Sequence, residues 1–330
     1  MVNTEHDPST SKLAADDFDD AESDIASEAT SRTSLRSSVM AYHVENGRTY
    51  HAMSAGKYFI PNDEPELERL DLQHTLFLLT LDDELALCPK KTGAKRVLDV
   101  GTGTGVWAVD YATANPDSEV IGVDLSPVQA SFVPTNCTFE TDDIEKEWVY
   151  SKPFDFIFSR MLGGSLADPQ GFIEQSFSKN SKLEPGGYLE MCDMILPVAS
   201  DDGTLAEDSF LVRMSHMTVE AAKRFGRPIH LAPEYASMFE KAGFVDVTVK
   251  KFKWPSNIWP ADKKHKNMGQ WNFVSMDGGL EGLTLALFTR ALGLTKEETQ
   301  VFCDGARKEI RDVHIHAYWT VCIVYGKKPE

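Results

Sequence analysis

The sequence has few cysteines, and they lack the spacings that metal sites and disulfide scaffolds require. Its five cysteines are scattered and form no Cys-x-x-Cys pair: Cys88, Cys137, Cys192, Cys303 and Cys322. This pattern disfavours both a structural zinc site and a disulfide framework, and we expect no metal in the functional site. Unpaired cysteines are typical of a protein from a reducing compartment.

Long apolar runs are also missing. No stretch approaches the roughly 18 apolar residues that a membrane-spanning helix needs. Residues 1–11 are polar and lack the apolar core of a secretory signal. We therefore expect no membrane association and a cytoplasmic location, with the nucleus as the alternative.

Positive charge is scarce throughout the chain. The 330 residues include 33 lysines and arginines but 51 aspartates and glutamates, which gives a formal net charge of −18. Binding to a phosphate backbone requires clustered lysine and arginine. We therefore expect no nucleic acid partner.

Residues 1–45 differ in composition from the rest of the chain. They are dominated by Ser, Thr, Ala, Asp and Glu, and such a segment cannot bury enough apolar surface to offset the entropy of ordering. We predict a disordered, acidic, serine-rich tail over residues 1–45 and a folded domain over residues 46–330.

The folded part is organised around a glycine-rich motif. Residues 96–100 predict a short buried strand of a parallel sheet, and residues 106–114 predict a helix. A strand, a glycine turn and a helix N-terminus in this order form a nucleotide-binding turn.

The residues of this turn, Asp99-x-Gly101-x-Gly103-x-Gly105, favour S-adenosylmethionine over a dinucleotide. A dinucleotide site needs a small residue where this sequence has Val106, and the Asp99 carboxylate would repel a pyrophosphate. S-adenosylmethionine carries an ammonium and a sulfonium but no phosphate, so the Asp99 carboxylate would attract this ligand. A tight glycine turn without a ligand is the alternative.

Acids that follow the next two predicted strands extend this donor site. Asp124 stands where a carboxylate accepts both ribose hydroxyls, although it could also be a turn residue or a helix cap. Asp142 and Asp143 follow the third strand, where a carboxylate can accept the adenine amine. Asp143 is favoured because Ile144 would then lie against the base; a plain loop acid is the alternative.

Together with a Pro-Gly-Gly turn at residues 185–187, these features resemble the class I S-adenosylmethionine-dependent methyltransferases. Shorter signatures narrow the resemblance and lie at residues 46–51, 61–64, 68–74, 201–204, 259–260 and 269–271. From about residue 42 onward, the chain resembles the fungal methyltransferases related to the velvet-partner global regulator of secondary metabolism, the LaeA-like family.

The resemblance implies a Rossmann-like, doubly wound α/β fold. Its seven-stranded sheet would have an antiparallel last strand, and β-rich runs at residues 245–254 and 314–325 would form its edge around a helical lid insertion near residues 258–312. The implied ligands of S-adenosyl-L-methionine are Asp99, Gly101, Gly103, Gly105, Asp124 and Asp143, with Asp142 as the alternative to Asp143.

Methyl transfer needs no metal, so the protein has mainly to position the acceptor and exclude water. A general base is required only if the acceptor must lose a proton. Candidates are His216 and His230, for which helix packing and a surface position are the respective alternatives. We expect the acceptor beside residues 159–163, with Glu190 and Cys192 beyond the next strand, and expect it to be a relatively apolar small molecule.

Two functions remain open from the sequence. The first is an enzyme that methylates a small-molecule intermediate of fungal secondary metabolism, favoured by an apolar lid expected from helices over residues 204–225 and 269–312. The second is a nuclear regulator of secondary metabolite gene clusters that keeps the fold but acts through protein partners, which is compatible with the tail.

Overall fold

The computed structural model describes residues 42–51, 58–130, 132–178 and 182–330. Most of the tail that we expect over residues 1–45 therefore lies outside the described residues. Its last three residues belong to a hairpin of β1 (His43–Glu45) and β2 (Arg48–Tyr50). Asn46 and Gly47 have φ of 52° and 84° at its turn, as a two-residue hairpin connection requires.

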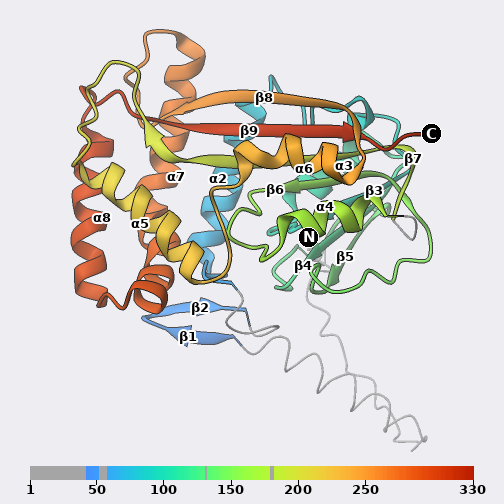
Figure 1. The fold of residues 1–330 in the computed structure, drawn as a ribbon, viewed down its shortest axis with the longest axis horizontal. Helices are drawn as coiled ribbons and strands as arrows, with labels where there is room; N and C mark the ends of the chain where they lie inside the picture. Colours follow the sequence, from blue (N-terminus) through green and yellow to red (C-terminus); the bar gives the residue numbers. More distant parts are fainter. Residues whose placement is uncertain (1–41, 52–57, 131, 179–181) are drawn as a thin grey trace, which may run out of the picture. The chain divides into compact units, whose positions relative to one another are not determined.

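A seven-stranded sheet forms the centre of the domain (Figure 1), with the strand order β5-β4-β3-β6-β7-β9-β8. Its strands are β3 (Arg96–Val100), β4 (Glu119–Asp124), β5 (Cys137–Thr141), β6 (Phe154–Arg160), β7 (Leu183–Ala199), β8 (Val245–Pro255) and β9 (Tyr318–Lys327). The strands β5, β4, β3, β6 and β7 pair in parallel, and β9 is antiparallel to both of its neighbours. The doubly wound sheet with an antiparallel last strand is thus confirmed.

The sheet is covered on both faces, as parallel sheets require. The helices are α2 (Glu64–Thr80), α3 (Val106–Ala114), α4 (Pro169–Phe177), α5 (Phe210–Arg224), α6 (Tyr235–Ala242), α7 (Lys263–Leu287) and α8 (Lys296–Arg311), with short turns η1 (Pro89–Lys91), η2 (Ala232–Glu234) and η3 (Phe288–Leu292). Successive residues of β3 lie in different cores: Val97 belongs to the core that includes Trp107 of α3, and Leu98 belongs to the core that includes Phe172 of α4.

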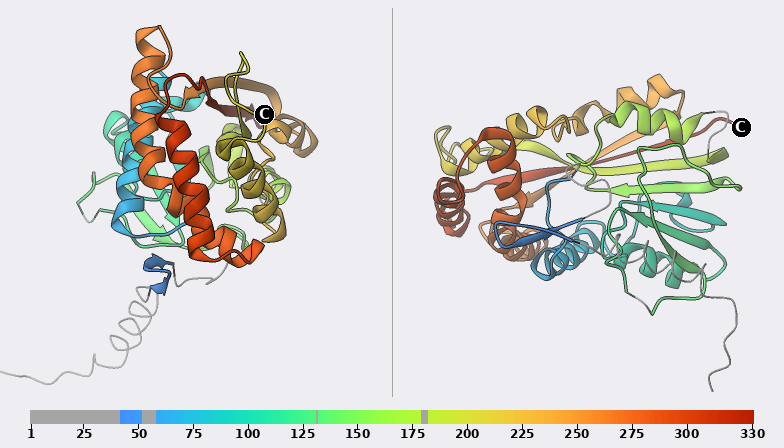
Figure 2. Two further views of the ribbon diagram at one scale, coloured as in Figure 1. Left: turned by 90° about the vertical axis from the view of Figure 1, so that its left-hand side faces the viewer. Right: turned by 90° about the horizontal axis from the view of Figure 1, so that it is seen from below.

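A third core lies mainly among helices, and Val198 of β7 and Trp319 of β9 also belong to it. It joins α5, α7 and α8, with Leu211, Leu280 and Cys303 among its fully buried side chains. Figure 1 shows these helices at one end of the sheet, and Figure 2 shows α7 and α8 side by side. Helix α2 also packs along α7. The chain between β8 and β9 supplies α7 and α8, where the sequence predicts a helical insertion.

Apolar side chains at three- and four-residue steps predict a helix over residues 64–87, but α2 begins at Glu64 and ends at Thr80. Of the two alternatives that the sequence leaves open for Asp124 besides ribose binding, a turn and a helix cap, the structure shows the turn. No helix follows Asp124 in residues 125–130 or 132–136. The Asp124 side chain accepts a hydrogen bond from the backbone N–H of Ser126, which lies two residues later. This bond stabilises a turn and does not cap a helix.

Within the described ranges, no helix is long and apolar enough to cross a membrane. The same residues contain no group of three or more His, Cys, Asp or Glu side chains that could hold a metal ion. All five cysteines are free and buried.

Candidate active site

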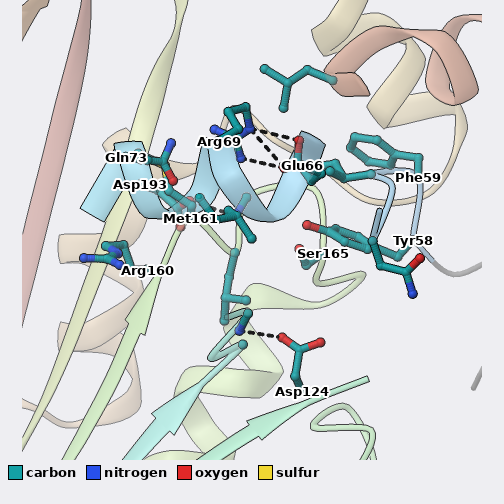
Figure 3. A pocket seen from close by; sticks show the side chains of 18 of the residues that line it. Tyr58, Phe59, Glu66, Arg69, Gln73, Asp124, Arg160, Met161, Ser165 and Asp193 are labelled. Atoms are coloured by element: carbon teal, nitrogen blue, oxygen red, sulfur yellow. Dashed lines mark hydrogen bonds and ion pairs between the residues drawn. The ribbon is translucent and has the colours of Figure 1, made fainter. Parts of the chain in front are cut away.

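A cavity opens at the carboxyl edge of the parallel strands (Figure 3), near the point where the strand order reverses between β3 and β6. Its volume is about 270 Å³. Its walls come from the loops after β3, β4 and β6, from α2, α5 and α7, and from residues 58–62. Open α/β sheets bind ligands at this place because the connections on the two sides of the reversal diverge.

The glycine-rich loop between β3 and α3 forms one wall of the cavity. Gly101, Gly103 and Gly105 have φ of 72°, 56° and 81°, in the left-handed region that favours glycine. Gly101 and Gly103 line the cavity, but Gly105 does not. A Cβ at Gly105 would lie 2.4 Å from Cζ of Phe139, so this glycine allows α3 to pack closely against β5.

Asp99 lies beside this loop and is only 3% exposed. Its Oδ2 accepts a hydrogen bond from Thr102 Oγ1 at 2.6 Å. Burial raises the pKa of Asp99 to about 6, although Thr102 and the charge of Arg160 oppose this shift. A ligand cation next to Asp99 would favour the ionised carboxylate.

Asp124 connects the glycine-rich loop to the loop after β4; we call the part of the cavity that these loops line its predicted donor end. Its Oδ2 accepts from the backbone N–H of Gly103 at 2.9 Å, and its Oδ1 accepts from that of Ser126 at 2.9 Å. Burial raises the pKa of Asp124, while these backbone donors lower it. Because each carboxylate oxygen has a second acceptor site, Asp124 can hold the glycine loop and still accept from a ribose.

Asp142 and Asp143 also line the cavity, next to Ile144. Asp142 Oδ1 accepts from the backbone N–H of Asp143 at 2.7 Å, which fixes the turn, and Asp143 is 3% exposed. The structure thus brings Asp99, Gly101, Gly103, Asp124, Asp142 and Asp143 to one cavity. Their roles as donor ligands stay predictions.

Helix α2 and the segment before it supply wall residues that the sequence did not assign to the site, although Arg69 and Gln73 lie within the signature at residues 68–74. Glu66 and Arg69 form an ion pair of 2.7 Å whose side chains are 3% and 7% exposed. Gln73 and Tyr58 line the same wall (Figure 3). The spacing of Glu66 and Arg69 by three residues is compatible with a helical pair. The spacing does not predict that the Glu66–Arg69 pair faces a ligand cavity, because this depends on how α2 packs in the folded domain.

The other end of the cavity is largely apolar. Its side chains come from β7, α5, α7 and β9 and include Met194, Leu196, Met214, Met276, Leu280, Leu283 and Trp319. One carboxylate, Asp193, stands among them. Its Oδ1 accepts from the backbone N–H of Gly163 at 2.8 Å, and its Oδ2 accepts from the hydroxyl of Tyr235 at 2.7 Å. Burial raises the pKa of Asp193 to about 6.

Of the residues expected near the acceptor, Arg160, Met161, Leu162 and Gly163 line the cavity, whereas Ser159, Glu190 and Cys192 do not. Successive side chains of a strand point to opposite faces, so Asp193 faces the cavity and its neighbour Cys192 does not. Glu190 instead accepts from the backbone N–H groups of Leu87 and Cys88.

The histidines proposed as general bases lie elsewhere. His216 is exposed on α5, and neither it nor His230 lines the cavity. Nδ1 of His230 is buried without a hydrogen-bond partner in the described part of the chain.

Comparison with known proteins agrees with this architecture. A family described as "Methyltransferase domain" matches residues 72–249. Methyltransferase pytC of Aspergillus terreus is 40% identical over 301 residues, which cover 91% of this chain and 92% of that protein. Probable methyltransferase tdiE of Emericella nidulans is 36% identical, with 80% and 82% covered.

A regulator is also among the relatives. Secondary metabolism regulator LAE1 of Cochliobolus heterostrophus is 32% identical over 295 residues, which cover 87% of this chain and 95% of that protein. The cavity at the sheet reversal, the glycine-rich loop that lines it and these similarities lead to one conclusion. The chain belongs to the methyltransferase family, as an S-adenosylmethionine-dependent enzyme related to both fungal methyltransferases and LaeA-like regulators of secondary metabolism.

Proposed function

We propose that this methyltransferase acts on a relatively apolar small molecule, an intermediate of fungal secondary metabolism. The observation that carries the proposal is the continuity of the cavity: one space joins the loops of the donor end to a wall of methionine, leucine and tryptophan side chains. Methionine side chains adapt to irregular apolar ligands. The relatives pytC and tdiE, both named as methyltransferases, support methyl transfer as the reaction.

When bound, S-adenosylmethionine supplies an electrophilic methyl group on a sulfonium. The chain's own contribution is to orient the acceptor and exclude water, for which the apolar side chains of α5 and α7 are suited. Both helices belong to the third core, which includes the cavity-lining Met214, Met276 and Leu280, so the acceptor wall is well supported.

We further propose Asp193 as the general base for an acceptor hydroxyl. As the acceptor oxygen bonds to the methyl carbon, its proton passes to the Asp193 carboxylate, and the carbon–sulfur bond breaks to leave a thioether. The pKa of about 6 keeps Asp193 ionised at neutral pH yet more basic than an ordinary aspartate. Gly163 and Tyr235 hold the carboxylate in place.

A second function, regulation through protein partners, is favoured by one observation, the 32% identity with the regulator LAE1. The two functions predict different metabolite profiles. An enzyme of one pathway affects a single methylated product and its precursor. A regulator affects the products of many clusters.

The deciding experiment compares the metabolites of a deletion strain that expresses the wild type, Asp193→Asn or Asp117→Asn. Asp117 is exposed and lies outside the cavity, so it serves as the matched control. Loss of one methylated product with Asp193→Asn alone supports the proposed enzyme. Loss of many unrelated products in the deletion strain, restored by Asp193→Asn, would contradict it.

A further inference from the structure

Arg160 is a partly buried cation that makes no ion pair with any described residue. It ends β6 and lines the cavity below the Gln73 end of α2 (Figure 3). Its guanidinium lies over the ring of Phe77, 4.7 Å from the centroid. Among the described residues, no carboxylate lies at ion-pair distance from it, and burial lowers the pKa of Arg160. Enclosing a charge without a partner is costly, so this site favours an anionic ligand group.

His74 contacts the guanidinium directly, and Asp110 orients His74. Nη1 of Arg160 lies 3.1 Å from Nδ1 of His74, and Nε2 of His74 lies 2.9 Å from Oδ2 of Asp110. A guanidinium only donates, so Nδ1 must accept and the ring proton must be on Nε2, where it is donated to Asp110. Burial lowers the pKa of His74 and thereby favours this neutral form, and Arg160 acts in the same direction.

Asp99 is near Arg160 and carries the opposite charge. The two groups influence each other's pKa electrostatically, and both line the donor end of the cavity. A carboxylate and a guanidinium in one wall complement a zwitterion, which presents an ammonium and a carboxylate together. The amino acid end of S-adenosylmethionine is such a zwitterion.

We propose that Arg160 binds the α-carboxylate of S-adenosylmethionine, and that His74 and Asp110 are positioning residues for Arg160. The inference rests on S-adenosylmethionine as the donor. The same contact prevents repulsion between the guanidinium and the donor's sulfonium. A free guanidinium in the same cavity would repel the sulfonium, whereas a guanidinium that is paired with the donor's own carboxylate is neutralised.

The test compares two ligands that differ only in this carboxylate, S-adenosylmethionine and decarboxylated S-adenosylmethionine, by calorimetry. Arg160→Met should weaken binding of the first about tenfold or more, the loss typical of a charge-assisted hydrogen bond. Binding of the second should not weaken, because Arg160 makes no ion pair with it and its removal also removes a charge that repels the sulfonium. Equal weakening of both ligands, or of neither, would overturn the proposal. If the wild type bound neither ligand, the donor assignment itself would be wrong.

The positioning residues are tested by the same affinity ratio, which a purely structural role would not change. Asp110→Asn and His74→Phe should each reduce the preference for the carboxylated ligand, and His74→Gln, which keeps an acceptor, should restore part of it. Thr75→Ala, next to His74 on α2, is the matched control and should preserve the ratio. An unchanged ratio in both Asp110→Asn and His74→Phe would refute the positioning role.

Discussion

Donor binding should depend on pH through Asp99. In the free protein, burial raises its pKa to about 6, so the carboxyl is largely protonated at pH 5. A donor ammonium stabilises the ionised form and would have to displace that proton. Affinity for S-adenosylhomocysteine should therefore fall as the pH drops below 6, by about tenfold per pH unit. Above pH 6, Asp99 should cause no further change.

The assay is calorimetry at pH 5 and pH 7.5, in buffers of different ionisation enthalpy, so that proton release is measured directly. We expect release of one proton per ligand from Asp99 at pH 5 and of none at pH 7.5. Asp99→Asn removes this group and serves as the control. Other titrating groups remain in that variant, so the difference between the two proteins isolates Asp99.

The same shift has a consequence for stability. Because the pKa is raised on folding, the contribution of Asp99 to stability is present below its unfolded pKa and is lost as the pH rises through 6. Asp99→Asn should therefore stabilise the free protein at pH 7.5 by up to about 3 kcal/mol.

The binding measurements can refute this account of Asp99. They would do so if the affinity of the wild type for S-adenosylhomocysteine did not change from pH 5 to 7.5, or if the affinity of Asp99→Asn changed with pH as steeply as that of the wild type.

Three further predictions concern other parts of the chain. Asp124→Ala should weaken S-adenosylhomocysteine binding at least about tenfold, since charge-assisted hydrogen bonds contribute roughly 1.5–3 kcal/mol each; unchanged affinity in calorimetry would refute the ribose role. Gly163→Leu should abolish turnover but spare donor affinity, because its Cβ would lie 3.1 Å from Oδ1 of Asp193; equal loss of both would assign Gly163 to the fold or the donor site. A chain that begins at Ala41 should keep its melting temperature. A chain that begins at Gly47 should melt a few degrees lower, because it loses β1 and the 2.6 Å ion pair of Glu45 with Arg290. Thermal denaturation of the two shortened proteins and the full chain measures both effects.

The donor end was predictable because its signals are local. The glycines and Asp99 lie within seven residues of each other, and their backbone conformation follows from residue type. Asp124 could be located because one strand and one helix separate it from that motif. Even here, the sequence did not distinguish a glycine that lines the cavity from Gly105, which is needed because Phe139 approaches it from β5.

The acceptor end was less predictable because it depends on tertiary register. Glu190, Cys192 and Asp193 are nearly adjacent, and only the position and pleat of a 17-residue strand decide that Asp193 faces the cavity. Arg160 was expected beside the acceptor but lies near Asp99, and its contact with His74 requires α2 to pack over the end of β6. No local pattern in the sequence specifies that packing.

The two ends of the cavity are formed by different parts of the fold, and this affects how the sequences of such proteins can diverge. The predicted donor end is formed by loops of the sheet, whereas much of the predicted acceptor wall comes from α5 and α7, which belong to the third core. Substitutions at positions such as Met214 or Leu283 can therefore reshape one end and leave the other intact. A lineage built on this scaffold can exchange acceptors, or lose its acceptor while it retains the donor site. Enzymes and regulators can thus descend from one ancestor without a change of fold.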